Sequence, residues 1–154
     1  MKYIALVVTM AVCALLACAA FAGEAPAPLY VSNRDLGGGA LNQYTPGVAG
    51  GIGVNNIGLL IRTYGKVTYV DTANQFFYID DGCGRTDGTK RPDNSIVLGV
   101  RVSYGGLAAG VAAIAPPAEN TRVAVTGIIS TCMVNTLVQP NVRARHGDDI
   151  LSMP

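Results

Sequence analysis

The sequence of 154 residues is poor in charge and contains no tryptophan, a single histidine and four cysteines. Charged residues make up 14% of the chain, and 11 Lys and Arg nearly balance 10 Asp and Glu, for a net charge of +1. This charge lacks the basic footprint that attracts nucleic acids and anionic membrane surfaces. His146 has no second histidine with which to build a zinc centre, and no serine lies in a nucleophile motif. We therefore expect a protein that is not an enzyme and needs no cofactor.

Residues 1–22 have the pattern of a secretory signal peptide. Lys2 precedes an uncharged apolar run over residues 3–17, and Ala20-Phe21-Ala22 provides the small residues that signal peptidase requires. We therefore expect an exported protein, extracellular or held at the cell surface. Leu15-Leu16-Ala17-Cys18 resembles a lipobox, so a lipid anchor at Cys18 is the alternative to release. No other long apolar run is free of Gly, Pro and charge, and we expect no transmembrane segment in the mature chain.

Two cysteines remain once the signal peptide is removed, Cys83 and Cys132. An oxidising compartment favours a disulfide between them, and closing a loop of about 50 residues would stabilise the fold by roughly 3–5 kcal/mol. Two separate buried thiols are the alternative. We predict the disulfide because of the expected compartment.

Residues 23–58, here called the N-terminal arm, differ in composition from the rest of the chain. Eight glycines fall between residues 37 and 58, among few large apolar side chains. Such a segment loses much entropy on ordering and contributes little core, so it is not expected to fold alone. It could be a linker, a cover for the following domain, or a strand lent to a neighbouring copy.

Residues 59–154 have the strand and turn pattern of a small all-β domain. Gly65 predicts a bulge or a bend in the first strand, and residues 71–74 read as a turn. Five strands in this length favour a Greek-key barrel over a β-sandwich, which usually needs seven. Residues 107–114 could form one or two helical turns, and residues 148–151 could extend the sheet edge. The five predicted strands cover residues 59–70, 75–80, 96–102, 122–134 and 141–145, the last preceded by 137–139.

Four segments carry a resemblance to a known family: Gly65-Lys66-Val67-Thr68, then residues 77–84, 100–102 and 123–128. Together they resemble the G-x-V, F-Y-I-D-D-G, V-x-V and V-T-G pattern of a bacterial family of secreted OB-fold domains. The resemblance implies a five-stranded OB-like barrel with an extended glycine-rich N-terminal arm. It implies no single function, because OB barrels carry many unrelated ones.

Two sets of side chains could form a site on such a barrel. OB barrels are associated with single-stranded nucleic acid or oligosaccharide, held by aromatic platforms beside basic groups. The possible ligand face comprises Arg62, Tyr64, Lys66, Tyr69, Phe76, Tyr78 and Arg101. The neutral charge argues against nucleic acid. A second set could bind calcium, although a turn whose carboxylates accept backbone hydrogen bonds is the favoured explanation: Asp80, Asp81 and Asp87.

The function that we expect is structural. A small, neutral, exported barrel with a long arm suits assembly into a homo-oligomer, extracellular filament or surface layer by strand addition. Binding of nucleic acid or oligosaccharide is the alternative function, and an arm folded onto its own barrel is the alternative placement. The candidate assembly residues are Leu29, Tyr30, Val31, Val48, Ile52, Val54 and Ile57.

Overall fold

The computed structural model describes residues 26–154, so the predicted signal peptide and Cys18 lie outside the described residues. Within this range the regular structure is β-strand apart from two short 3-10 turns, η1 (Asn33–Asp35) and η2 (Gly147–Asp149). The prediction of an all-β fold is confirmed. None of the described residues belongs to a helix long and apolar enough for a membrane span. The strands are β1 (Leu29–Tyr30), β2 (Leu60–Asp71), β3 (Phe76–Asp80), β4 (Val100–Ser103), β5 (Arg122–Val134), β6 (Leu137–Arg143) and β7 (Ile150–Met153).

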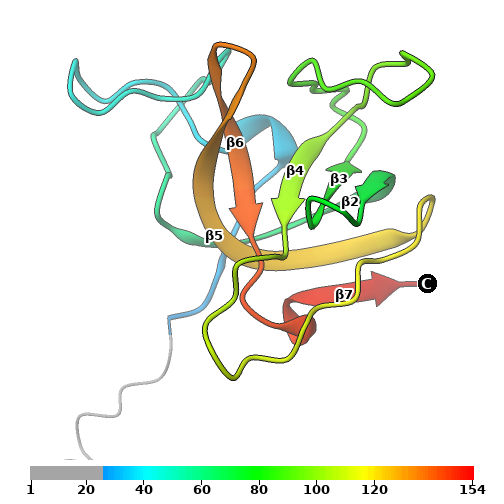
Figure 1. The fold of residues 1–154 in the computed structure, drawn as a ribbon. Helices are drawn as coiled ribbons and strands as arrows, with labels where there is room; N and C mark the ends of the chain where they lie inside the picture. The colour runs from blue at the N-terminus through cyan, green and yellow to red at the C-terminus, as the bar shows by residue number, and fades with distance from the viewer. Residues whose placement is uncertain (1–25) are drawn as a thin grey trace, which may run out of the picture.

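Hydrogen-bonded ladders connect five of these strands in a ring. The ring runs β2–β3–β4–β6–β5, and β5 pairs back with β2. Every pair in it is antiparallel except β4–β6, which is parallel. The strand β1 pairs with β2 in parallel and β7 pairs with β5, both outside the ring (Figure 1). The sheet therefore has seven strands, where the sequence predicted five.

The long strands β2 and β5 belong to two ladders each, which lets the sheet curl. The first half of β2 pairs with β5 and the second half with β3. Gly65 lies near this change of partner, and a Cβ there would come within 2.8 Å of the Asp80 backbone. Glycine is therefore needed for close approach of two strands rather than for a bulge. The irregularity of register lies two residues later, between Val67 and Tyr69.

Alternate side chains of the ring strands point inward and form one core. Phe77 and Ile79 of β3 are fully buried, as are Val123 and Val125 of β5. Burial of each such side chain contributes roughly 1.5–3 kcal/mol. The arm adds Leu36, which is also fully buried in this core cluster.

Three predicted elements differ in the structure. The third strand begins at Val100 instead of residue 96, because Gly99 has φ +107° and its Cα lies against the carbonyl of Ile79. Residues 107–114 contain turns and no helix; Gly110 at φ +85° and the following prolines interrupt any helical path. The last ring strand, β6, ends at Arg143, two residues before the predicted end.

The N-terminal arm covers the barrel of its own chain. The Gly58 amide donates to the Ile129 carbonyl at 2.8 Å, and the Ala49 amide donates to the Val138 carbonyl at 2.7 Å. Arg85 holds the arm from the other side, since its guanidinium donates to the carbonyls of Arg34, Leu36 and Ala49. Of the three roles considered for the arm, these contacts correspond to the second, a cover for the following domain.

Candidate functional site

The predicted ligand face is divided between two surfaces. Tyr69, Phe76, Tyr78 and Arg101 gather on the outer side of β2, β3 and β4, where Tyr78 is opposite both Tyr69 and Arg101 in the ladders. The remaining three residues, Arg62, Tyr64 and Lys66, lie on the half of β2 that pairs with β5. The curl of β2 separates the two groups.

The first group is a closed cluster. The rings of Phe76 and Tyr78 meet edge to face at 5.8 Å between centroids, and the Arg101 guanidinium lies 4.1 Å from the Phe76 centroid. The loop after β3 covers Tyr78, whose hydroxyl group hydrogen-bonds to Asp87 and Thr89, and the residue has no exposed surface. Burial and the bond to Asp87 raise the pKa of Tyr78. Tyr78 is therefore not available as a stacking platform.

The predicted calcium ligands are engaged in two different places. The Asp81 carboxylate accepts the amide of Asn33 at 2.8 Å, while Asp87 binds Tyr78. Burial acts to raise the pKa of Asp81, but the hydrogen bonds from Asn33 and Cys83 outweigh it and the pKa is lowered. The carboxylate oxygens of Asp80 and Asp81 lie within 4.8 Å of each other and of the Cys83 sulfur. Asp87 is not part of this group. The arrangement fits the turn interpretation better than a calcium loop.

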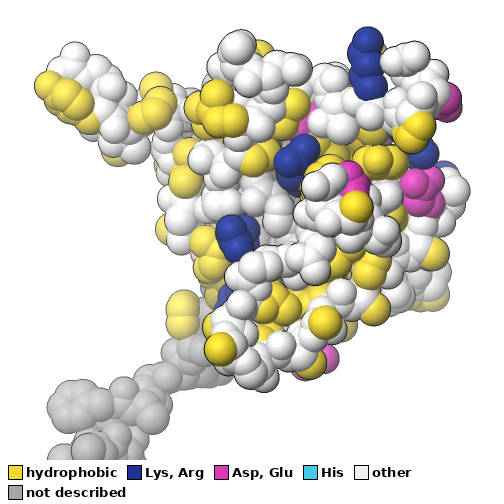
Figure 2. Space-filling view, viewed as in Figure 1, with side chains coloured by type: hydrophobic (Ala, Val, Ile, Leu, Met, Phe, Trp, Pro, Cys, Tyr) yellow, Lys and Arg dark blue, Asp and Glu magenta, His cyan; other side chains and the backbone are white. Residues whose placement is uncertain are grey.

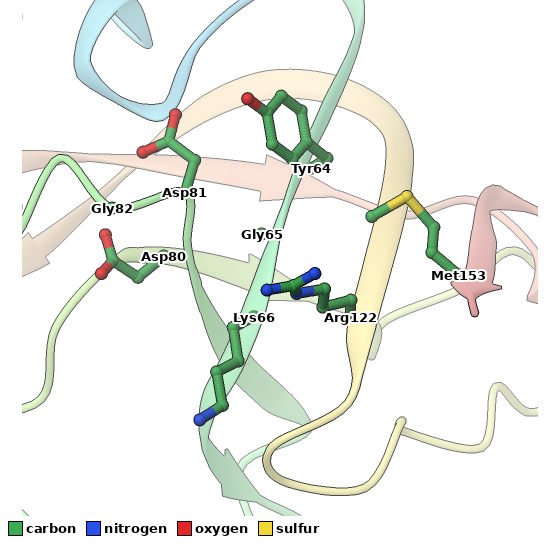
Figure 3. Close-up of a pocket in the computed structure, with 8 residues that line it drawn as sticks. All are labelled: Tyr64, Gly65, Lys66, Asp80, Asp81, Gly82, Arg122 and Met153. Atoms are coloured by element: carbon green, nitrogen blue, oxygen red, sulfur yellow. The ribbon is translucent and has the colours of Figure 1, made fainter.

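Two residues of the second group, Tyr64 and Lys66, line a groove across β2 with a volume of about 530 Å³. Arg62 is not among its lining residues and instead donates to the Thr126 hydroxyl group at 2.8 Å. Gly65 lies in the middle of the groove, between Tyr64 and Lys66 (Figure 3). Lys66 lies directly opposite Arg122 in the β2–β5 ladder, a like-charged pair that costs stability unless an anion compensates it. Tyr64 and Asp81 lie on the other side of Gly65, so the groove offers an aromatic ring, two cations and a carboxylate.

The predicted disulfide is wrong for this structure, in which both cysteines are free. Cys83 lies in the exposed turn after β3, and Cys132 lies in the far half of β5, opposite Gln139. The two cysteines therefore belong to different elements, and no disulfide joins them in this structure. Burial raises the pKa of both thiols, so both are weak nucleophiles at neutral pH.

The most prominent apolar surface belongs to the arm loop, residues 40–46. It projects from the barrel at the upper left of Figure 1, and Figure 2 shows hydrophobic side chains on this projection. Leu41 is 72% exposed and Tyr44 is 85% exposed. The loop is ordered by its own hydrogen bonds, since the Asn42 side chain accepts the amides of Tyr44 and Thr45 at 2.8 and 2.9 Å.

The predicted assembly residues occupy different environments. Val48 is buried over Gly37, and Val31 and Ile57 pack against the core. The other four are exposed: Leu29, Tyr30, Ile52 and Val54. Sequence reasoning missed Leu41 and Tyr44, although two large apolar residues in a glycine-rich stretch next to Thr45-Pro46 were a usable signal.

Comparison with known proteins adds no relative: no family model, no curated protein and no solved structure matches the chain. The functional argument therefore depends on the surfaces described above.

Proposed function

We propose that this protein is an exported, non-catalytic structural module that associates with further copies of itself through its N-terminal arm. The observation that carries the proposal is the exposure of Leu41 and Tyr44 on an ordered, projecting loop. A loop that only connects two elements is usually polar, and apolar side chains at its tip stabilise nothing within the chain. Large exposed apolar patches mark contact sites with other molecules.

We propose contact through the arm loop in place of strand addition. The backbone of β1 already pairs with β2 of the same chain, and the arm is held by Arg85 and by amide–carbonyl bonds to β5 and β6. Strand exchange would require these bonds to break first. Contact through Leu41 and Tyr44 requires no release, because neither side chain has a place in the core.

The ring of strands supports an OB-like barrel as the scaffold of this module. Counted along the chain, the five ring strands are β2, β3, β4, β5 and β6. In the ring, the first pairs with the second, the second with the third, the third with the fifth, the fifth with the fourth, and the fourth with the first. The single parallel pair joins the third and the fifth, β4 and β6. This order supports the OB-like Greek-key barrel that we propose as the scaffold. Within residues 26–154 the closed ring leaves no free edge of its own for a strand of a second copy, and the outer edges of the sheet belong to β1 and β7.

The proposal is tested by the mass of the purified protein in solution. Sedimentation velocity over about a hundredfold range of concentration should show a mass that rises with concentration. The variant Leu41→Ser/Tyr44→Ser should remain a monomer, while the matched variant Ile96→Ser/Leu98→Ser, at exposed apolar positions outside the arm, should assemble like the parent. A parent that is monomeric throughout, or two variants that behave alike, would refute the role of the arm loop.

Binding of an acidic oligosaccharide is a second candidate, favoured by the groove of Figure 3. A sugar ring can stack on the exposed Tyr64, its carboxylate can pair with Lys66 and Arg122, and its hydroxyl groups can donate to Asp81. A nucleic acid fits less well, because Asp80 and Asp81 repel its continuous line of phosphates. Titration with an oligogalacturonate should show binding that Lys66→Gln weakens and Gln43→Ala leaves unchanged. Stronger binding of a single-stranded oligonucleotide would favour nucleic acid instead.

A further inference from the structure

A second apolar surface lies in a hollow beneath the loop that follows β4. The hollow has a volume of about 570 Å³, a size that accommodates two large side chains. Figure 2 shows hydrophobic side chains gathered inside this loop, with Lys or Arg side chains beside them. Its apolar lining comes from the loop, the middle of β5 and the chain just after β6: Leu107, Ala108, Val111, Ile128 and Ala144. Arg143, Arg145 and His146 form its polar rim.

The chemistry of the rim indicates an occupant that is apolar and uncharged. Arg145 is already paired with Asp149 at 2.8 Å. Arg143 forms no ion pair within residues 26–154 and donates only to the Gly105 carbonyl, at 3.4 Å. A guanidinium in this position can bind carbonyl or hydroxyl oxygens, as Arg85 does with three carbonyls in this chain, and can lie over an aromatic ring.

We propose that this hollow receives the arm loop of a second copy, an inference that rests on the proposed self-association. Leu41 and Tyr44 would enter the apolar floor, and Arg143 would bind the Tyr44 hydroxyl group or the amide oxygens of Asn42 and Gln43. The loop carries no charge and presents two apolar side chains, which matches the apolar walls of the hollow. Arg145 and His146 also line it, but both lie at the Asp149 carboxylate, so Arg143 is the lining cation without a carboxylate partner in residues 26–154.

The positions of the two surfaces define the kind of assembly. In Figure 1 the arm loop lies at the upper left and the loop after β4 at the lower left, well apart, so a chain cannot fill its own hollow. Each copy then donates with one surface and receives with another. Such a head-to-tail contact does not close on itself in a dimer and continues into a linear polymer or a ring. The contact is small, so its affinity should be modest and assembly should depend on concentration.

The test pairs two defective variants. The loop variant Leu41→Ser/Tyr44→Ser loses the donor surface, and the hollow variant Val111→Arg fills and charges the receiving surface. Val111 is exposed, so the hollow variant should unfold at the same temperature as the parent, and Ile96→Arg is its matched control. Each variant alone should sediment as a monomer, and a mixture of the two should form dimers of one copy of each. The change Arg143→Gln should raise the dissociation constant of the parent about tenfold.

The possible failures can be told apart. Assembly of the loop variant, or a monomeric parent, would refute both the proposed function and the receiving site. A monomeric loop variant together with a hollow variant that assembles like the parent would keep the proposed function and overturn the receiving site. Two monomeric variants whose mixture stays monomeric would also overturn it, because the intact arm loop of the hollow variant would then fail to bind the intact hollow of the loop variant.

Discussion

Replacing Asn33 by alanine should release the N-terminal arm from the barrel. The Asn33 side chain is fully buried; its amide donates to the Ile79 carbonyl at 3.0 Å, and its oxygen accepts the Thr63 hydroxyl group at 2.8 Å. The substitution leaves the carbonyl and the hydroxyl group buried without this partner. At roughly 1–3 kcal/mol for each unsatisfied group, the free energy of unfolding should fall by about 2–4 kcal/mol.

Urea unfolding followed by circular dichroism measures this loss directly, and the slope of free energy with urea should stay unchanged. A double-mutant cycle with Thr63→Val isolates the shared hydrogen bond, and its coupling energy should be about 1 kcal/mol. Trypsin should also cleave after Arg34 faster in the variant. Gln43→Ala, at an exposed position of the same arm, is the control. A loss below about 0.5 kcal/mol for Asn33→Ala, or a coupling energy near zero, would refute the reasoning.

Three further predictions concern the barrel and its thiols. Gly99→Ala should lower the free energy of unfolding by about 3 kcal/mol or more, because residue 99 has φ +107° and its new Cβ would lie 2.1 Å from the Ile79 carbonyl oxygen. The control Gly147→Ala, whose Cβ would meet no atom within 4 Å, should be close to neutral in the same thermal unfolding experiment. Asp149→Asn should cost about 2 kcal/mol at pH 7 through the lost pairing with Arg145. Because the pKa of Asp149 is lowered in the fold, this stabilisation is complete above the ordinary carboxyl pKa and the difference should shrink as the pH falls below about 4. If Cys18 is not lipidated, the exported protein has two thiols, and a chromogenic thiol reagent should react with both after unfolding. In the native protein the exposed Cys83 should react first. No reaction after unfolding would indicate a disulfide between the two cysteines.

The strands were predictable where alternation and β-branched residues dominate a segment. The segment 122–134 was predicted with the bounds that β5 has, and the turn predicted at residues 71–74 is present one residue later, at 72–75. The third strand was predicted too long because Ile96-Val97-Leu98 has the same apolar pattern as Val100-Arg101-Val102. The difference comes from Gly99, whose positive φ turns the chain where it meets β3. Such a contact has no signal in the local sequence.

The candidate site was predictable in its residue types and not in its grouping. The aromatic and basic residues of β2, β3 and β4 were identified, but their division into a closed cluster and an open groove depends on how β2 curls. Tyr78 reads like an exposed platform in the sequence, and only the loop carrying Asp87 and Thr89 buries it. The pairing of Lys66 with Arg122 arises from residues far apart in the chain, which the ladder between β2 and β5 brings together.

Composition and alternation by themselves determined an all-β chain with a glycine-rich arm that needs a partner, because local preferences of residues act over a few neighbours. Tertiary structure alone decided where that partner is: the arm lies on its own barrel, Cys83 and Cys132 stay apart, and Leu41 and Tyr44 remain in solvent. These outcomes depend on which buried polar groups and apolar surfaces meet across the fold, as Asn33 meets Thr63 and Ile79, and contacts of that range leave no pattern along the chain.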